Sequence, residues 1–361
     1  MIMSEKSKQH VDSCRFCWMC HHICPIGNAT GLERDTARAR ALGISLVNRG
    51  AVKPEEIIDN IYECALCGGC VNFCVTGWNP VMFTKEARLQ AALDGILPPY
   101  IAKLLENCQN TGSAYGKKDL PGDLAAAVKA HAAKTDTLFF LGDDARNGGE
   151  SAAAVSAVKV LEKTGEPFTV LADEPASGAQ LDFLIGAAAE TKEQMQKAAA
   201  VLNQYKTVII LDPADAKAVK QLYKEYGVEV KAAVKTFTAF AAEQLQAGRL
   251  AVKKTAETVT LHDAFELARD LEETEPARAL VNAAADLKEM LLNRKETIFA
   301  GNLLMAQYLP DVTRKVAARR IFNARSIGVS TIVTESVGET AALKNAAEDG
   351  VKIVFIADLL K

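Results

Sequence analysis

The chain has 361 residues, of which 49% are hydrophobic, and its 42 Lys and Arg against 45 Asp and Glu give a net charge of −3. This length predicts two or three domains with sizeable cores. The chain has no excess of basic residues that would indicate nucleic-acid binding. No apolar run approaches the roughly 20 residues of a membrane span. The polar start of the chain lacks the apolar core of a signal peptide.

Residues 1–12 predict a short polar arm, and two cysteine runs with the spacing C-x2-C-x2-C-x3-C follow it. Eight of the nine cysteines lie in these runs: Cys14, Cys17, Cys20 and Cys24, then Cys64, Cys67, Cys70 and Cys74. Three thiolates at this spacing can hold one face of a cubane iron–sulfur cluster, and the fourth typically binds the other cluster of a pair. We therefore predict that these eight cysteines hold two [4Fe–4S] clusters.

The cysteine pattern has two other interpretations. A disulfide framework is typical of small secreted domains, whereas this chain is long and leaves Cys108 as an odd cysteine. Structural zinc takes four ligands from paired knuckles, which three evenly spaced cysteines and a displaced fourth fit less well, so zinc stays as an alternative. Thiolates intended for iron require a reducing compartment, which predicts a cytoplasmic location. We expect Cys108 to be a buried apolar residue.

The residues around and between the runs predict a helical region. Arg15, His21 and His22 flank the first run, where positive charge would raise the potential of an anionic cluster. Solvent exposure is the simpler expectation for the two histidines, since cysteine already supplies a full ligand set. Pro54 and the two glutamates after it are typical of a helix start. Further helices are expected over 80–95 and 101–112.

A polar stretch over 113–134 predicts a domain boundary, after which short apolar strands alternate with Ala-rich helices. This alternation predicts a mostly parallel sheet with helices on both faces. Two pairs of strands repeat at an offset of about 120 residues, which indicates a duplicated α/β unit. The predicted strands cover 137–142, 168–173, 207–212, 258–263, 297–302, 331–336 and 352–360.

The helical insert of about forty residues between the runs is too long for a compact bacterial ferredoxin. It resembles the α-helical ferredoxin module of succinate dehydrogenase iron–sulfur subunits and of heterodisulfide reductase-type proteins. The whole chain resembles the family of D-type heterodisulfide reductase subunits and the iron–sulfur subunit of anaerobic glycerol-3-phosphate dehydrogenase. The stretches CRFCWMCHHICPIGNATG and VTLHDAFELARDLEETEPARALV carry this resemblance.

The expected fold class is therefore α plus α/β, with a helical ferredoxin module followed by two pseudo-repeated parallel-sheet units. The domains are predicted at 1–112, 135–252 and 253–361. By resemblance to two-cluster ferredoxins, the ligands cross between the runs. Cys14, Cys17 and Cys20 would share a cluster with Cys74, and Cys64, Cys67 and Cys70 would share one with Cys24.

The chain departs from this family where each α/β unit should carry a Cys-Cys-Gly motif. Phe265 stands where a cysteine would follow His262 and Asp263, and the segments 212–215 and 335–338 also lack cysteine. These units would thus be degenerate Cys-Cys-Gly domains without ligands for a third cluster, and the family's disulfide-reducing chemistry should not be carried over. His262 and Asp263 are expected to be a remnant of the family motif.

No convincing catalytic motif occurs in the chain, and we expect the segment 142–149 to be a polar turn at a strand end. The resemblance implies an electron-transfer subunit of an oxidoreductase complex in anaerobic metabolism. Its expected partners are a flavin-dependent dehydrogenase and a second electron-transfer protein or membrane acceptor, with which it could lie at the membrane periphery. The alternative is a reductase in its own right that binds a small substrate in the α/β crevice.

Overall fold

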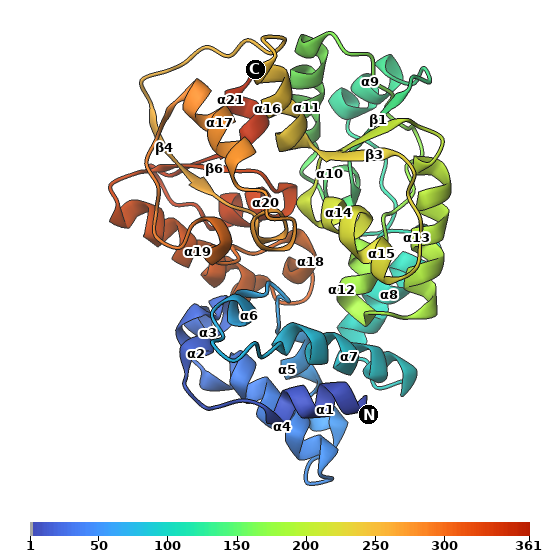
Figure 1. The fold of residues 1–361 in the computed structure, drawn as a ribbon, viewed down its shortest axis with the longest axis vertical. Coiled ribbons are helices and arrows are strands. Elements are labelled where there is room, and N and C mark those ends of the chain that lie inside the picture. The colour runs from blue at the N-terminus through green and yellow to red at the C-terminus, as the bar shows by residue number, and fades with distance from the viewer. Residues whose placement is uncertain (1–2) are drawn as a thin grey trace.

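The computed structural model describes residues 3–361, and it places a helical N-terminal module next to two α/β units (Figure 1). The module ends with α8 (Pro99–Thr111), and β1 (Thr137–Phe140) is the first strand. All strand pairs are parallel, which confirms the predicted fold class of a helical module followed by parallel sheets with helices. The domain limits predicted at 112, 135 and 253 lie between regular elements and remain a prediction.

Short helices make up the module. The polar arm expected over 1–12 is wrong for its described part, because α1 (Glu5–Asp12) is a helix capped by the Ser4 side chain, which accepts a hydrogen bond from Ser7 N. Met1 and Ile2 lie outside the described residues. The other module helices are α2 (Met19–Ile23), α3 (Pro25–Thr30), η1 (Glu33–Asp35), α4 (Ala37–Asn48), η2 (Pro54–Glu56), α5 (Ile58–Tyr62), α6 (Gly69–Asn72) and α7 (Pro80–Leu93).

The first α/β unit is built on a three-stranded sheet with the order β1-β2-β3, where β2 is Thr207–Ile210 and β3 is Ala233–Thr236. On the outer side of β1, Thr169 forms a single parallel bridge with Leu138. The helices of this unit are α9 (Gly122–Ala130), α10 (Asp143–Arg146), α11 (Ser151–Thr164), α12 (Ala179–Ile185), α13 (Ala189–Leu202), α14 (Pro213–Lys217), η3 (Ala218–Leu222), α15 (Tyr223–Glu225) and α16 (Phe237–Gln246).

The second unit repeats this topology with the strand order β5-β4-β6-β7. Its short outer strand β5 stands where the Thr169 bridge stands in the first unit. The strands are β4 (Thr258–His262), β5 (Asp286–Leu287), β6 (Thr331–Thr334) and β7 (Lys352–Phe355). The helices are η4 (Glu266–Asp270), α17 (Glu275–Ala284), η5 (Arg294–Glu296), α18 (Leu303–Ala306), α19 (Pro310–Ser326), α20 (Val337–Ala346) and α21 (Ile356–Leu359).

Several sequence-based assignments were wrong in detail. The strand predicted over 352–360 ends at Phe355, because the chain turns there into α21. The apolar segment 297–302 is not a strand, because side chains bind its backbone in place of a neighbouring strand: Ala300 N donates to Glu339 Oε1. Of the segment 168–173, only Thr169 pairs with a strand. The segment 113–134 contains α9, and the half-exposed strand β3 and the two-residue strand β5 were missed.

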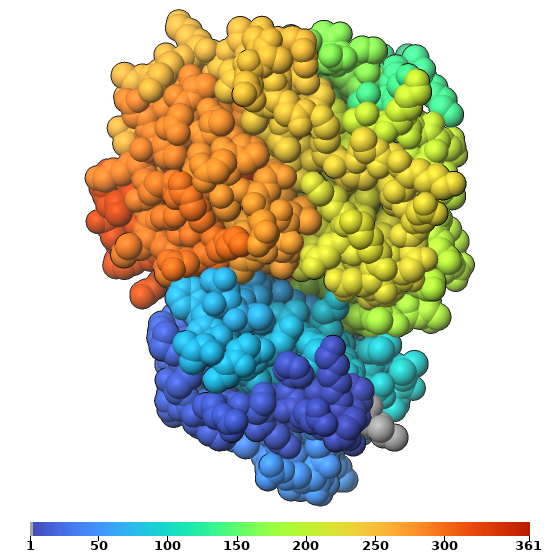
Figure 2. All heavy atoms as spheres, viewed as in Figure 1, coloured from blue at the N-terminus to red at the C-terminus, as the bar shows by residue number. Residues whose placement is uncertain are grey.

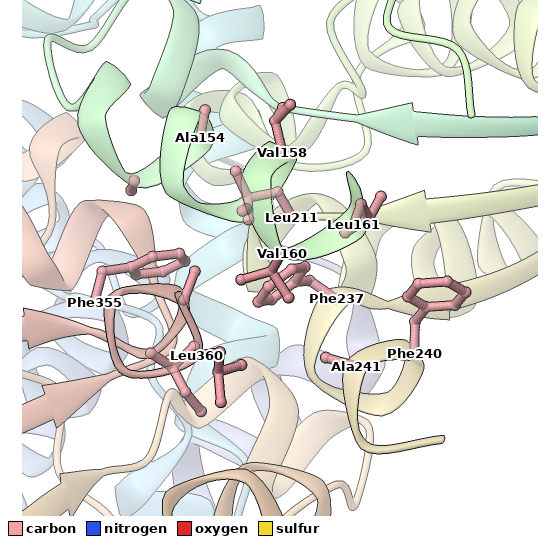
Figure 3. Packing of buried hydrophobic residues seen from close by; sticks show 14 of the residues in the cluster. Ala154, Val158, Val160, Leu161, Leu211, Phe237, Phe240, Ala241, Phe355 and Leu360 are labelled. Carbon is pink, nitrogen blue, oxygen red and sulfur yellow. The ribbon is translucent and has the colours of Figure 1, made fainter. Parts of the chain in front are cut away.

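A shared core joins the two units. Helices α11 and α16 of the first unit pack against α21 and α17 of the second, and these pairs are equivalent in the repeat. Phe237 and Phe355 stack in this core with ring centroids 6.4 Å apart, near Val160 and Leu360 (Figure 3). Because both sheets bury apolar side chains in one continuous cluster, the units form a single body.

The helical module packs against both units (Figure 2). Helix α12 of the first unit contacts α7 and α8, and its Leu184 and Ile185 are buried in the same cluster as the module's own core. From the second unit, α19 packs on α3. Across residues 3–361, no helix combines the length and the apolar character needed to cross a bilayer.

Candidate iron–sulfur site and adjoining cleft

The two cysteine loops have the same backbone conformation. In each loop, the residues before and after the second cysteine, Cys17 or Cys67, have left-handed backbone conformations. Three of these four residues are not glycine. Such residues are costly and persist only where the surrounding structure requires them. The φ angles are 55° at Phe16 and 66° at Trp18, and 52° at Leu66 and 72° at Gly68. The two loops therefore share the same unusual backbone conformation beside their second cysteine.

Both loops also direct a backbone N–H at their first thiol. Phe16 N lies 3.4 Å from Cys14 Sγ, and Leu66 N lies 3.4 Å from Cys64 Sγ. Hydrogen bonds from the backbone to sulfur stabilise a thiolate and tune the potential of a cluster bound to it. The two loops are thus prepared for the same ligand chemistry.

The cysteines gather in two groups, each drawn from both runs. One pocket is lined by Cys14, Cys17 and Cys20 together with Cys74, from the far end of the second run. The Cys74 thiol lies 3.3 Å from Thr76 Oγ1. Burial raises the pKa of this thiol, but hydrogen bonds from Thr76 and the following backbone amides outweigh burial and lower it.

The second group surrounds Cys70. Burial raises its pKa well above the usual value, and Cys67, Cys64 and Cys24, followed by Cys20 of the first group, lie near enough to raise it further. Cys24 and Cys67 also share one buried cluster. Since a bound metal removes the proton from a coordinating thiol, these high pKa values describe the metal-free thiols.

The arrangement of the thiols fits an iron–sulfur cluster better than a single metal ion. Within residues 3–361, no three His, Cys, Asp or Glu side chains converge closely enough to hold one metal ion. The thiolates of a cubane stand apart around a larger inorganic core. The donor set, the repeated loop backbone and the two mixed groups of four therefore fit [4Fe–4S] clusters.

The two loops differ sharply in exposure. In the first loop, Phe16, Cys17, Trp18 and Met19 are all exposed, with 60% of the Phe16 surface accessible. In the second loop, Ala65, Leu66 and Cys67 are buried. The second loop is covered because Phe265 and Phe299 of the second α/β unit pack in one cluster with Ala65 and Cys67.

Arginines hold both loops. On the first, the Arg38 guanidinium lies 3.9 Å from the Trp18 ring centroid, a cation–π contact. On the second, Arg88 Nη2 donates to Cys64 O at 2.6 Å, and Arg269 Nη2 donates to Cys67 O at 2.6 Å. Arg88 is fully buried, and Arg269 comes from η4, some 200 residues along the chain from the loop it binds.

A cleft adjoins the second loop. Its volume is about 1160 Å³, and it lies where the module meets both α/β units. Ala65, Leu66 and Gly68 of the loop form part of its wall. The residues that follow β1, β2 and β4 form another part, so the carboxyl ends of parallel strands from both units face it, as in many α/β ligand sites.

Carboxylates from equivalent positions line this cleft. Asp144 and Glu266 each lie four residues after the last residue of β1 and β4, in the first and second unit. Asp212 caps the N-terminus of α14, and Asp215 lies in the first turn of that helix. The sequence places acidic residues after these strands, but it predicted only a polar turn and a helix start there, and no shared cleft. Their convergence depends on how the two units face each other, which no local pattern reveals.

Comparison with known proteins bears on the cysteine loops. Residues 10–78 match the family model of the 4Fe-4S dicluster domain. This match supports [4Fe–4S] chemistry over the zinc alternative and makes electron transport the function of this part of the chain.

Similarities beyond the dicluster domain are distant. A protein from Chromohalobacter salexigens named "Probable membrane-anchored ferredoxin" is 23% identical over 245 residues, which cover 64% of this chain but only 37% of that protein. A hypothetical protein from Helicobacter pylori has a TM-score of 0.59 at 11% identity, with 99% of this chain and 72% of that one covered. A putative Asp/Glu racemase from Yersinia pestis, 11% identical over 62% of this chain and 95% of its own, has a TM-score of only 0.29. The Helicobacter structure shows a shared fold alone.

The remaining predicted residues lie as follows. His21 and His22 of the dicluster domain are exposed, as expected for solvated side chains. Cys108 is buried among apolar residues of the module core, also as expected. Arg15 is exposed beside the first loop. The segment 142–149 contains a turn of helix, α10, and two of its acids, Asp143 and Asp144, reach the cleft.

His262 and Asp263 are buried and do not line the cleft. His262 Nδ1 accepts a hydrogen bond from Arg320 Nε at 3.0 Å, and its Nε2 lies 3.1 Å from Glu339 Oε2. Asp263 accepts two hydrogen bonds from Arg278, at 2.6 and 3.0 Å. Both residues are engaged by buried partners, which gives them a structural role here.

We expect Arg269→Gln to weaken the second loop. The change leaves the carbonyls of Cys67 and Thr297 without their donor, which should lower the free energy of unfolding by about 2 kcal/mol. Loss of a nearby positive charge should also make the potential of a cluster at this loop more negative. Redox titration followed by EPR measures the second effect. Arg319→Gln, which removes an exposed guanidinium near the Phe322 ring, should change neither quantity.

Asp212 predicts a pH-dependent stability. Burial raises its pKa to about 6, so the folded state holds a proton that the unfolded state releases near pH 4. This contribution to stability is complete below about pH 4 and is lost as the pH rises through about 6. Asn also caps helices, so Asp212→Asn should stabilise the protein by about 1–2 kcal/mol at pH 8, by about half as much at pH 5, and hardly at all near pH 3. Equal denaturation midpoints of variant and parent at pH 8 would contradict this.

Proposed function

We propose that this chain is an iron–sulfur electron-transfer subunit that carries two [4Fe–4S] clusters and relays single electrons between two partners. The observation that carries the proposal is the difference in exposure between its two cysteine loops. A relay needs one cluster that a donor can approach and a second that is shielded from water and directed at another site. The exposed first loop and the covered second loop meet these two needs.

The ligands of each cluster come from both runs in this proposal. Cys14, Cys17 and Cys20 hold the first cluster with Cys74, in support of which all four line one pocket. Cys64, Cys67 and Cys70 hold the second with Cys24, whose thiol lies within electrostatic reach of Cys67 and Cys70. Crossed ligation ties the two halves of the dicluster domain together and keeps the clusters near each other.

The donor in this proposal is a flavin-dependent dehydrogenase or oxidoreductase, and the first loop is its docking surface. Phe16, Trp18 and Val75 present exposed apolar surface there. Arg15 and the two histidines surround it with positive or titratable groups. An apolar centre with a basic rim fits a partner with an acidic rim around its own redox centre.

The acceptor is a second electron-transfer protein or a membrane-bound acceptor, which would place a cytoplasmic chain at the periphery of the membrane. The name of the Chromohalobacter relative, a membrane-anchored ferredoxin, supports such an association. The chain would then be a variant of the family that contains D-type heterodisulfide reductase subunits and the iron–sulfur subunit of anaerobic glycerol-3-phosphate dehydrogenase. Its two repeated α/β units support that assignment, while their missing cysteines leave them as scaffold.

One observation favours a second candidate function, a reductase that acts by itself. The cleft borders Ala65, Leu66 and Gly68, so a small molecule bound in it would lie beside the second cluster. Electrons would then pass from the second cluster to that small molecule, without a second protein. Turnover of a small substrate by the purified chain with a chemical reductant alone would favour the reductase over the relay.

Cluster content and ligand sharing can be tested together. Anaerobic analysis should find about eight iron and eight acid-labile sulfide per chain. Cys74→Ser should perturb the EPR signal of the exposed cluster, and Cys24→Ser that of the buried one. Cys108→Ser is the matched control, since this cysteine is buried in the module core, and it should leave both signals unchanged. Iron for a single cluster, or a Cys74→Ser effect confined to the buried cluster, would contradict the assignment.

The docking surface can be tested with the native complex. Anaerobic purification should co-elute a flavoprotein, and Trp18→Ser should weaken its binding at least about tenfold, because a buried tryptophan anchor often contributes 2 kcal/mol or more. Leu291→Ser is the control, since Leu291 is 80% exposed but belongs to the second α/β unit. Equal affinities for both variants, with unchanged cluster spectra, would move the donor to another surface.

A further inference from the structure

The cleft beside the second loop holds more negative than positive charge. Its wall contains nine acidic residues and four basic ones, and two of the basic residues are already paired. Lys85 lies 2.7 Å from Asp182, and Lys217 lies 2.7 Å from Asp270. A third, Arg269, is engaged by backbone carbonyls of the second loop and of residues 295 and 297. Seven of the nine cleft acids form no ion pair within residues 3–361, and four of these seven are considered next: Asp144, Asp212, Asp215 and Glu266.

These four acids are only partly satisfied by neutral groups. Tyr115 donates to Asp144 at 2.5 Å, and Ser177 donates to Asp215. Asp212 is only 4% exposed, and among the described residues neither its Oδ2 nor Glu266 Oε2 has a hydrogen-bond partner. Buried carboxylates without partners are costly and call for protons or a cation.

Helix N-termini offset a small part of this charge. Asp212 caps α14, and a Cβ added at Gly338, in the first turn of α20, would stand 2.5 Å from Asp144 Oδ2. Each helix N-terminus carries about half a positive charge at most, so the two together balance about one of the four carboxylates. Lys217 also acts electrostatically on Glu266, and Arg269 remains charged, but the acids of the cleft wall still outnumber its basic residues by nine to four.

The arrangement of the acids fits a spread-out cation. They come from both α/β units, and no three of the His, Cys, Asp or Glu side chains in residues 3–361 converge on one point. Leu66, Leu222, Phe265 and Leu304 line the same cleft and offer apolar wall. Several carboxylates that line one cleft together with apolar side chains match ammonium groups joined by methylene segments, and about 1160 Å³ is ample for such a molecule.

We propose that this cleft binds an aliphatic amine that carries two or more ammonium groups. The ammonium groups pair with Asp212, Glu266 and the acids beside them, and the methylene segments lie against Phe265 and its apolar neighbours. Bound there, the amine lies beside the second cysteine loop. The site is independent of the identity of the electron donor and acceptor.

Isothermal titration of the full-length protein, with its clusters oxidised and no partner present, tests this proposal with spermidine as the probe. Spermidine should bind, and Asp212→Asn and Glu266→Gln should each weaken binding at least about tenfold, because truncating one partner of a buried charge pair typically has an effect of that size or larger. Glu225→Gln is the matched control: Glu225 also lines the cleft, but it is exposed, and this variant should bind within about twofold of the parent.

Four outcomes would overturn the proposal. They are no heat of binding with spermidine at millimolar concentration, equal affinity for butylamine, equal loss of affinity in the Glu225→Gln control, and displacement of spermidine by stoichiometric Mg²⁺. The last would assign the acids to a metal ion. Unchanged cluster absorption in each variant shows that the protein is folded. Because no electron transfer is measured, failure here leaves the relay function untouched, and failure of the relay leaves this site standing.

Discussion

The hydrogen bonds from two guanidinium groups to the second cysteine loop are the constraint on which the rest of the structure depends. Arg88 reaches the loop from the module, and Arg269 reaches it from the second α/β unit, and each donates to a cysteine carbonyl. Backbone carbonyls in a strained loop cannot be satisfied by a regular helix or strand, so these donors replace it. The loop, the module and the second unit are thereby fixed to one another, and Phe265 and Phe299 pack in one buried cluster with Cys67 and Cys24.

This contact makes two nearly identical loops behave differently. Both have left-handed residues on each side of the middle cysteine and an N–H directed at the first thiol. Only the second is buried, where low polarity disfavours added negative charge on a cluster while Arg88 and Arg269, and the buried Arg40 within electrostatic reach of Cys64 and Cys24, favour it. Environment and not ligand identity would therefore separate the two potentials, and the exposed loop remains free for a partner.

The sequence was sufficient where the information is local. Eight cysteines on one repeated template indicated the dicluster domain, and alternating apolar runs and Ala-rich helices indicated parallel sheets. It failed where the outcome depends on distant contacts. The segment 297–302 has the composition of a strand, yet Ala300 N bonds the Glu339 side chain and no neighbouring strand. In the sequence, Arg269 is one of several charged residues in a short segment. Its hydrogen bond to the Cys67 carbonyl exists only in the folded chain.

The repeat explains why acids gather in the cleft. Duplicated parallel sheets that share one core turn the carboxyl ends of their strands toward a common space, so whatever follows β1 and β4 meets there. In this chain the residues that meet are Asp144 and Glu266, joined by Asp212 and Asp215. A cleft selected for stability alone would be apolar or neutral, because unpaired buried carboxylates destabilise the fold. These acids are relieved either by protons, which their raised pKa values favour, or by the cationic ligand proposed for the cleft.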